Sequence, residues 1–359
     1  MAPMAQMMMA RTAGKHMASV LSFASMPILL APLLGPVIAG ALLQFASWRW
    51  LFLINLPVGA LALVLAIFFL PNDCDETKPR DLDLVGLALL SPGLVLFLYG
   101  SDHISDRAGL ATLAVSVLLL VAFCQWAIRK KAQAIIDLQL FTGKIFAAAA
   151  VTQFMQNGIS FAGQMLIPIF LNRACGRSPS ATGLLLAPLG LGMMCGYPFV
   201  GALTKRFGNR RVSAGGGLLA LAGTLPFIYL ASHGLVITIL VCALFLRGMG
   251  MSAVGAPSIT AAYSSVKRED LPMATTTLNI VQRIGGPTLT TICATFLGWR
   301  LASAHGPDTV HGAFKTAFML LCLFHSLLIA AAMRLPLSVE GGAKPTLAIA
   351  PAAQESVSE

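Results

Sequence analysis

Charged residues are scarce in this sequence. Asp, Glu, Lys and Arg make up 11% of the 359 residues, whereas 57% are hydrophobic and the mean hydropathy is +0.81. Because a soluble domain carries about 25% charged residues, this composition predicts an all-α polytopic membrane protein whose first partner is the lipid bilayer. The net charge of +10 does not indicate nucleic-acid binding, since the basic residues lie mostly in loops between apolar runs.

Motifs for catalysis, cofactors and metals are also missing. There is no H-E-x-x-H, no G-x-S-x-G, no P-loop and no dinucleotide-binding glycine motif. The glycines at 215–217 and 248–250 lie inside apolar runs, where glycine permits close helix packing. The seven cysteines show no C-x-x-C spacing. The sequence therefore predicts no enzyme, no cofactor, no metal site and no disulfide framework.

Apolar runs long enough to cross a bilayer are abundant. A transmembrane helix needs roughly 20 mostly apolar residues. Ten runs qualify, at 17–44, 49–70, 83–100, 108–128, 145–171, 179–203, 212–231, 235–262, 272–300 and 313–334. The apolar segment 1–10 is too short to span a bilayer. We interpret it as the end of a helix whose beginning is missing. The segment 130–144 predicts an interfacial cytoplasmic connector, and the tail 336–359, without periodicity, predicts disorder.

The basic residues set the orientation of these helices. Sixteen Lys and Arg fall at the two chain ends and in every second loop, whereas five fall in the alternate loops. Cytoplasmic loops carry the excess of Lys and Arg. The sequence therefore predicts that both termini are cytoplasmic, which agrees with an even number of helices.

A polar stripe runs along the otherwise apolar segment 145–171. Its members recur at helical spacing and are Gln153, Gln156, Asn157, Ser160 and Gln164. Such a stripe either joins one helix to its neighbours or lines a water-filled path. Five amides and hydroxyls exceed what one helix contact needs, so we favour the path.

Basic side chains inside the apolar runs are candidates for a site, because a charge at the bilayer centre costs at least ~2.5–3.5 kcal/mol. Arg247 lies in the middle of 235–262. Arg283 lies in 272–300 beside Gln282 and on one helix face with Asn279. That face either lines a polar cavity, or Arg283 reaches carbonyl groups of a neighbouring helix or of a kink at a proline. No Asp or Glu lies centrally in any run, which is a poor basis for proton coupling.

The stretch from 32 to 59 combines a packed, bent helix with an interfacial corner. Small residues let helices approach closely, proline bends them, and Trp and Arg anchor at the membrane surface. These residues are Gly35, Pro36 and Gly40, then the corner residues Trp48, Arg49 and Trp50, and then Asn55 in the following apolar run.

This stretch resembles the antiporter signature of the major facilitator superfamily, in its fourteen-helix drug:proton antiporter branch. The family pattern is GPxxGG followed by W-R-W-x-F-x-I-N-x-P-x-G, and here Ala39 replaces one glycine. The segment 201–211, GALTKRFGNRR, resembles the family's cytoplasmic loop motif, with Lys205 at the acidic position. Its matching residues are Gly201, Arg206, Gly208 and Arg210. Segments 135–141, 247–257 and 279–287 fit the family as well.

The resemblance implies a domain organisation. The ten runs correspond to the fifth to fourteenth helices of the family, and the chain is therefore expected to be an N-terminally truncated member. Residues 1–70 would be the remnant of the N-terminal bundle, 71–144 two linker helices with the connector, 145–335 a C-terminal six-helix bundle, and 336–359 a cytoplasmic tail.

The resemblance also implies a function. The expected protein is a monomeric efflux transporter in a bacterial inner membrane, which exchanges protons for amphipathic or cationic drugs or toxic metabolites by alternating access. The truncation is expected to impair this transport. Gln153, Gln156, Asn157, Ser160, Asn279, Gln282 and Arg283 would line its substrate cavity, and Arg247 would be a buried charge. The alternatives are a non-transporting remnant or interaction protein and an uncoupled facilitator.

Overall fold

The computed structural model describes residues 35, 38, 39, 42, 47, 49–69, 83–103, 106–130, 134, 136–266, 270–302 and 307–337. Helices are the only regular elements in these ranges, which confirms the prediction of an all-α fold for the described part of the chain. The helix end predicted at 1–10 lies outside the described residues, as do Pro36, Gly40 and Trp48. Of the predicted run 17–44 only residues 35, 38, 39 and 42 are described, and of the predicted tail 336–359 only residues 336 and 337.

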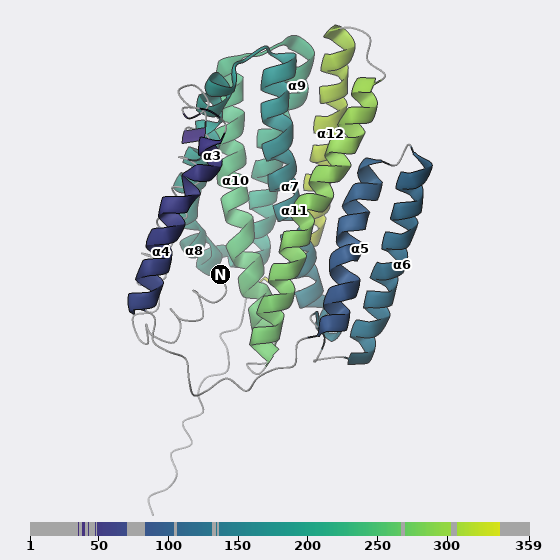
Figure 1. Ribbon diagram of the computed structural model, residues 1–359. Helices are drawn as coiled ribbons and strands as arrows, with labels where there is room; N and C mark the ends of the chain where they lie inside the picture. The colour runs from purple at the N-terminus through teal and green to yellow at the C-terminus, as the bar shows by residue number, and fades with distance from the viewer. Residues whose placement is uncertain are drawn as a thin grey trace, which may run out of the picture.

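Six long or medium helices form a bundle in the second half of the chain (Figure 1). They are α7 (Lys144–Ile169), α8 (Pro179–Thr224), α9 (Pro226–His233), α10 (Ile237–Ser264), α11 (Leu271–Ala302) and α12 (Pro307–Ala332). A π-helical turn, η4 (Phe170–Ala174), extends α7. Fully buried aromatic rings of α9, α12 and η4 pack edge to face or tilted at one end of the bundle, through Phe170, Phe227, Phe314 and Phe318.

Helix α8 contains a break that sequence analysis places between two separate runs. At Gly208 the backbone has φ 84° and ψ 163°, so the helix stops and starts again in a new direction. The first part begins at a standard cap, because the Ser178 hydroxyl accepts a hydrogen bond of 3.3 Å from the Ala181 N–H. The break divides α8 into the two apolar runs that the sequence predicts.

A helical hairpin of α5 (Leu84–Asp102) and α6 (Arg107–Lys130) packs beside α11 (Figure 1). The buried Ser116 hydroxyl of α6 donates to the Gly93 carbonyl of α5 over 2.7 Å. At the start of α5, Asp83 accepts hydrogen bonds from the Gly86 N–H and from Nε1 of Trp126, at 3.0 and 2.9 Å. A short 3₁₀ helix, η3 (Leu138–Thr142), then leads into α7.

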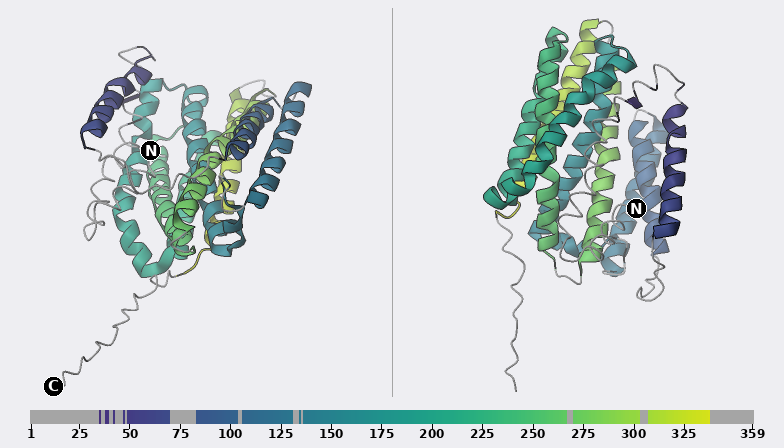
Figure 2. Two further views of the ribbon diagram at one scale, coloured as in Figure 1. Left: turned by 60° about the horizontal axis from the view of Figure 1, so that its bottom comes forward. Right: turned by 90° about the vertical axis from the view of Figure 1, so that its left-hand side faces the viewer.

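The first described helices are α3 (Trp50–Leu53) and α4 (Asn55–Phe69). Figures 1 and 2 show α4 on the side of the bundle away from α5 and α6. Nearly every described side chain of α4 is exposed, and those of Leu56, Ile67 and Phe68 are 67–79% exposed. An apolar helix this exposed presents its surface to lipid or to a further element.

Five of the described helical segments are long and apolar enough to cross a membrane: Leu84–Ser101, Arg107–Lys130, Pro179–His233, Ile237–Ser264 and Thr309–Ala332. The segment Pro179–His233 contains the break at Gly208 and continues into α9. Helices α7 and α11 are outside this set, and both carry the polar residues that the sequence marked as site candidates. The structure therefore supports a membrane bundle without establishing ten spans.

Candidate functional site

The side chains of the polar stripe of α7 face three different surroundings: α10, α11 and a pocket. The amide of Gln153 is completely buried and donates to the Gly255 carbonyl and the Ser258 hydroxyl of α10, both at 2.8 Å. Gln156 donates to the Met251 carbonyl of the same helix at 3.1 Å. These two amides join α7 to α10, which is the role that the alternative reading of the stripe assigned to them.

Other members of the stripe point elsewhere. Asn157 lies against α11, since a Cβ atom added to Gly286 would approach its Oδ1 to 2.9 Å. The exposed Gln164 donates to the hydroxyl of Ser160 at 3.2 Å. Ser160 and Gln164 both line a pocket that neither Gln153 nor Gln156 lines. Ser160 and Gln164 are therefore the two members of the stripe that face an open space, as the predicted polar path requires.

Arg247 of α10 is the buried charge that the sequence predicts, at 2% exposure. Its Nη1 donates to the Thr224 hydroxyl of α8 at 2.9 Å, and its Nη2 donates to the Ile159 carbonyl of α7 at 3.0 Å. No carboxylate of the described residues pairs with it. A guanidinium group has five N–H donors, so three of them are free for water or for a ligand.

Glycine on two helices makes room for Arg247. A Cβ atom on Gly163 of α7 would overlap the guanidinium group, and one on Gly223 of α8 would overlap the backbone at Arg247. Beyond Thr224 lies the fully buried His325 of α12, whose Nε2 is 3.4 Å from the Thr224 hydroxyl. The other ring nitrogen of His325 bonds to the Leu321 carbonyl at 2.8 Å. Arg247 thus connects three helices and reaches a fourth through Thr224.

A pocket of about 560 Å³ adjoins Arg247. One wall is formed by Gly35 and Ala39 from the motif stretch, and the others by α7, α8 and α10. Its polar side chains are Ser160, Gln164 and Arg247; the rest of the lining is apolar or glycine, and is Gly163, Ile167, Leu186, Leu189, Met193 and Met251. Mostly apolar walls with a few polar groups are typical of small-molecule sites of this size. The arrangement suits an amphipathic molecule.

The predicted face of α11 does not line this pocket. Asn279 donates within its own helix, to the Thr275 carbonyl at 2.9 Å. Gln282 is half-buried, and Arg283 is exposed. These residues lie on a different helix from the pocket lining, and the structure brings them together with neither Ser160 nor Arg247.

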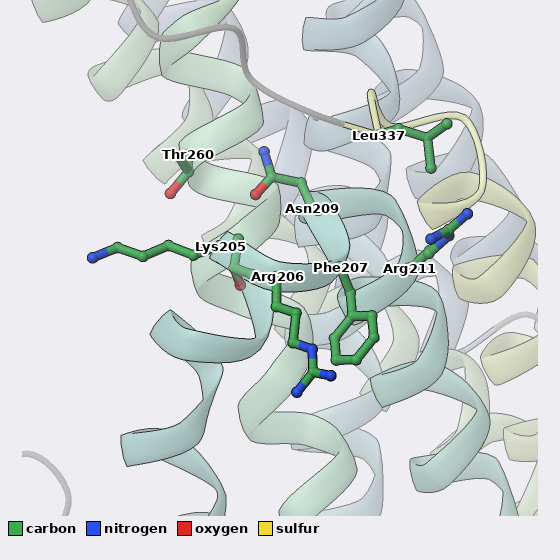
Figure 3. Close-up of a pocket in the computed structure, with 9 residues that line it drawn as sticks. Lys205, Arg206, Phe207, Asn209, Arg211, Thr260 and Leu337 are labelled. Carbon is green, nitrogen blue, oxygen red and sulfur yellow. The ribbon is translucent and has the colours of Figure 1, made fainter.

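The residues of the predicted cytoplasmic loop surround the break in α8 (Figure 3). Gly201 and Arg206 are exposed and precede it, while Arg210 follows it and is half-buried. The Arg210 N–H donates to the Pro336 carbonyl at 3.3 Å. A pocket of about 520 Å³ lies at this break.

The described part of the interfacial corner is exposed. Arg49, Trp50 and Asn55 all lie at the surface, with Trp50 53% exposed. Gly35 is exposed in the same way and contributes to the pocket beside Arg247. The anchoring role of the Trp and Arg side chains at a membrane surface stays a prediction.

Sequence reasoning missed Thr224, Gly163 and Ser258. Threonine and serine in an apolar run usually bond to their own helix, so their sequence gives no signal of a partner on another helix. Gly163 is one of 33 glycines. Its role in making room for the Arg247 guanidinium group is visible only from its position in the fold. A search for a small residue facing every buried charge would have found it once the helix pairs were known.

Comparison with known proteins relates the chain to a family. The sequence profile of the Major Facilitator Superfamily matches residues 1–286 and 145–346. The chain is 30% identical over 357 residues to the multidrug resistance protein B homolog of Mycobacterium tuberculosis (strain ATCC 25618 / H37Rv), across 97% of this chain and 62% of that protein. It is 34% identical over 245 residues to MdtD of Klebsiella pneumoniae (strain 342), across 64% of this chain and 49% of the relative. The chain is 30% identical over 318 residues to MdtD of Escherichia coli O9:H4 (strain HS), across 87% of this chain and 66% of that protein.

Proposed function

The chain belongs to the Major Facilitator Superfamily of membrane transporters, and we propose that it takes part in the efflux of amphipathic or cationic small molecules by alternating access. Family membership confirms the prediction that it is not an enzyme. The M. tuberculosis relative is named for multidrug resistance, and the chain spans 62% of that relative's length. The activity of a whole transporter therefore enters here as a proposal.

The pocket beside Arg247 carries this proposal. It lies between the motif stretch and the second-half bundle, which is where a superfamily transporter with two halves would bind substrate. The apolar lining would hold the body of an amphipathic molecule, while Ser160, Gln164 and Arg247 would orient its polar end. Asn157, Asn279, Gln282 and Arg283 are proposed to act at the margins of the same path during the transport cycle, whereas Gln153 and Gln156 are proposed to hold α7 against α10.

The membrane arrangement is part of the proposal. We place ten transmembrane helices in a bacterial inner membrane, with both termini in the cytoplasm and the chain acting as a monomer. The excess of Lys and Arg in alternate loops supports this orientation. The domain division at 70, 144 and 335 follows the same helix assignment.

Proton exchange would drive transport in this proposal, and one observation favours an uncoupled facilitator as the second candidate. In the described helices α7 to α11, no Asp or Glu is present, and Asp308 lies at the very start of α12. Proton coupling needs a titratable group in the path. In α7 to α12, the described side chains that titrate near neutral pH are those of histidine.

Transport by the purified chain in proteoliposomes tests the proposal. Ethidium trapped inside should leave faster than from protein-free liposomes, and an inward proton gradient should speed its exit. The double variant Ser160→Ala/Gln164→Ala should lower this rate, whereas the control Ser326→Ala/Gln125→Ala, at exposed positions outside the pocket, should not. Dye loss equal to that of empty liposomes would refute transport. Exit that ignores the gradient would establish the facilitator instead.

A further inference from the structure

The break in α8 contains a second pocket whose lining is unlike that of the first. It is lined by Thr204, Lys205, Arg206, Phe207, Gly208, Asn209, Arg211, Thr260 and Leu337 (Figure 3). Figure 3 shows Lys205, Arg206 and Arg211 extending in different directions around the break. Three cationic side chains and no acidic one face this space.

These cations have no counter-ion among the described residues. No ion pair involves Lys205, Arg206 or Arg211, and the ring of Phe207, 5.3 Å from the Arg206 guanidinium carbon, is the neighbouring group of Arg206. The family's loop motif has an acidic residue where this chain has Lys205, so the substitution removes a negative charge and adds a positive one. Clustered like charges repel each other, and an external anion would relieve that repulsion.

Asn209 gives independent evidence for a ligand. Its side chain is only 2% exposed, lines the pocket and makes no hydrogen bond to any described residue. The amide atoms of Asn209 are not enclosed by the protein and are accessible from the pocket, and the two N–H groups of an Asn side chain are donors. An acceptor oxygen in the pocket would satisfy them. The nearby Thr260 hydroxyl already donates to the Ala256 carbonyl at 2.9 Å and can only accept.

The backbone holds this lining in place. At Gly208 the φ of 84° is a conformation that favours glycine, and a Cβ atom there would overlap the Leu337 carbonyl. The Arg210 N–H to Pro336 carbonyl bond fixes the restart of the helix to the segment after α12. The lining of the pocket therefore comes from two distant parts of the chain that the backbone holds together.

Apolar side chains around the pocket indicate a lipid rather than a free ion. Leu203, Phe207 and Leu337 are 40–49% exposed next to the cations. A soluble phosphate has no use for apolar neighbours, whereas a phospholipid presents its phosphate and its acyl chains together. Basic pockets between transmembrane helices at the membrane surface bind anionic head groups. We propose that this pocket binds the phosphate of an anionic phospholipid, with Arg206, Arg211 and the Asn209 amide as its ligands.

Native mass spectrometry of the purified chain in uncharged detergent tests this proposal. Phosphatidylglycerol and phosphatidylcholine of equal chain length are added in turn, and the bound lipid is counted. The chain should retain phosphatidylglycerol in preference to phosphatidylcholine. The variant Arg206→Gln/Arg211→Gln should weaken its retention roughly twenty-five-fold, since each of the two basic residues near an anionic lipid contributes about a fivefold effect.

Matched variants separate this site from general positive charge. Arg173→Gln/Arg177→Gln removes two exposed arginines beyond the opposite end of the same helix segment and should leave retention unchanged. Asn209→Asp keeps the shape of the side chain but places a carboxyl group against the phosphate, so it should also lower retention. Arg206→Lys/Arg211→Lys keeps both charges and should preserve the preference for phosphatidylglycerol. The melting temperature of each variant in detergent confirms that it is folded.

Three results would overturn the proposal. The first is equal retention of the two lipids by the unmodified chain. The second is an equal loss in the Arg173→Gln/Arg177→Gln control. The third is release of phosphatidylglycerol when inorganic phosphate or a poly-glutamate peptide is added at a concentration equal to that of the lipid. Inorganic phosphate would then identify a free-anion site, and the peptide an acidic protein partner.

Discussion

The contact of α10 with α8 and the contact of α5 with α6 are both close helix packings, but they differ in how much of each helix they bury. In its most apolar stretch, α10 is 50% buried, whereas α5 and α6 are 22% and 17% buried. Between α8 and α10, glycines meet backbone directly: Gly192 and Gly248 on facing helices have no room for a Cβ atom. In lipid, where apolar burial drives little association, this close approach is what holds helices together.

The hairpin of α5 and α6 has one such close approach, where a Cβ atom on Gly100 would lie 2.7 Å from the backbone N of Leu113, and it adds polar contacts. One hydroxyl, that of Ser116, crosses its middle, and the carboxylate of Asp83 joins its ends. Lys130 adds an ion pair to Asp83 at 3.6 Å. A packing that buries less of each helix and has fewer close glycine approaches should be weaker than the packing of α10 on α8. The comparison predicts that substitutions in the first contact unfold the bundle, while those in the second loosen the hairpin alone.

The largest effect is expected from Gly216→Leu. A Cβ atom at Gly216 would lie 2.8 Å from the Ala253 Cβ and from the Gly250 carbonyl, whereas the adjacent Gly215 has no atom within 4 Å. Overpacking of this kind costs about 3 kcal/mol. Thermal unfolding in detergent should show a strongly lowered melting temperature for Gly216→Leu and an almost unchanged melting temperature for Gly215→Leu. Equal melting of the two variants would show that close backbone approach does not stabilise this contact.

Thr224→Val should have the next largest effect. It removes the acceptor of the Arg247 Nη1 donor inside the bundle, and a hydrogen bond to a charged group contributes about 2 kcal/mol. The exposed Thr238→Val on α10 is the control. Chemical unfolding followed by tryptophan fluorescence measures both. A neutral Thr224→Val would mean that Arg247 obtains its hydrogen bonds from water or from the pocket.

Two members of the α7 stripe separate packing from transport. Gln153→Ala breaks the bonds to α10 and should lower stability by about 1 kcal/mol, with little effect on the transport rate per folded molecule. Gln164→Ala, at an exposed position in the pocket wall, should change transport with little effect on stability. Melting curves and the ethidium assay on the same samples measure both effects. The reverse pattern would return Gln153 to the substrate path.

Sequence periodicity located the helices well, and it located the partners of their side chains poorly. The predicted run 235–262 and the observed α10 (Ile237–Ser264) differ by two residues at each end, because run length and polar breaks are local properties. Gln153 and Ser160 share one stripe by spacing, yet one meets α10 and the other faces a pocket. That difference depends on which helices cross α7 and at what height, which is decided by glycines on other segments. The burial of Arg247 followed from its position in the run, but its partners on α7 and α8 did not.

Ser116→Ala should have the smallest effect and completes the comparison. The Ser116 hydroxyl is fully buried and donates to the Gly93 carbonyl across the hairpin; interhelical bonds of this kind in membranes contribute about 0.6 kcal/mol. Hydrogen exchange should therefore rise about threefold in α5 and α6 and stay unchanged in α8 and α10, because the hairpin contacts the bundle mainly through α11. The exposed Ser91→Ala on α5 is the control. If exchange rose equally throughout the bundle, the hairpin would be a cooperative part of it rather than a separately opening unit, and the contrast between the two kinds of contact would not hold.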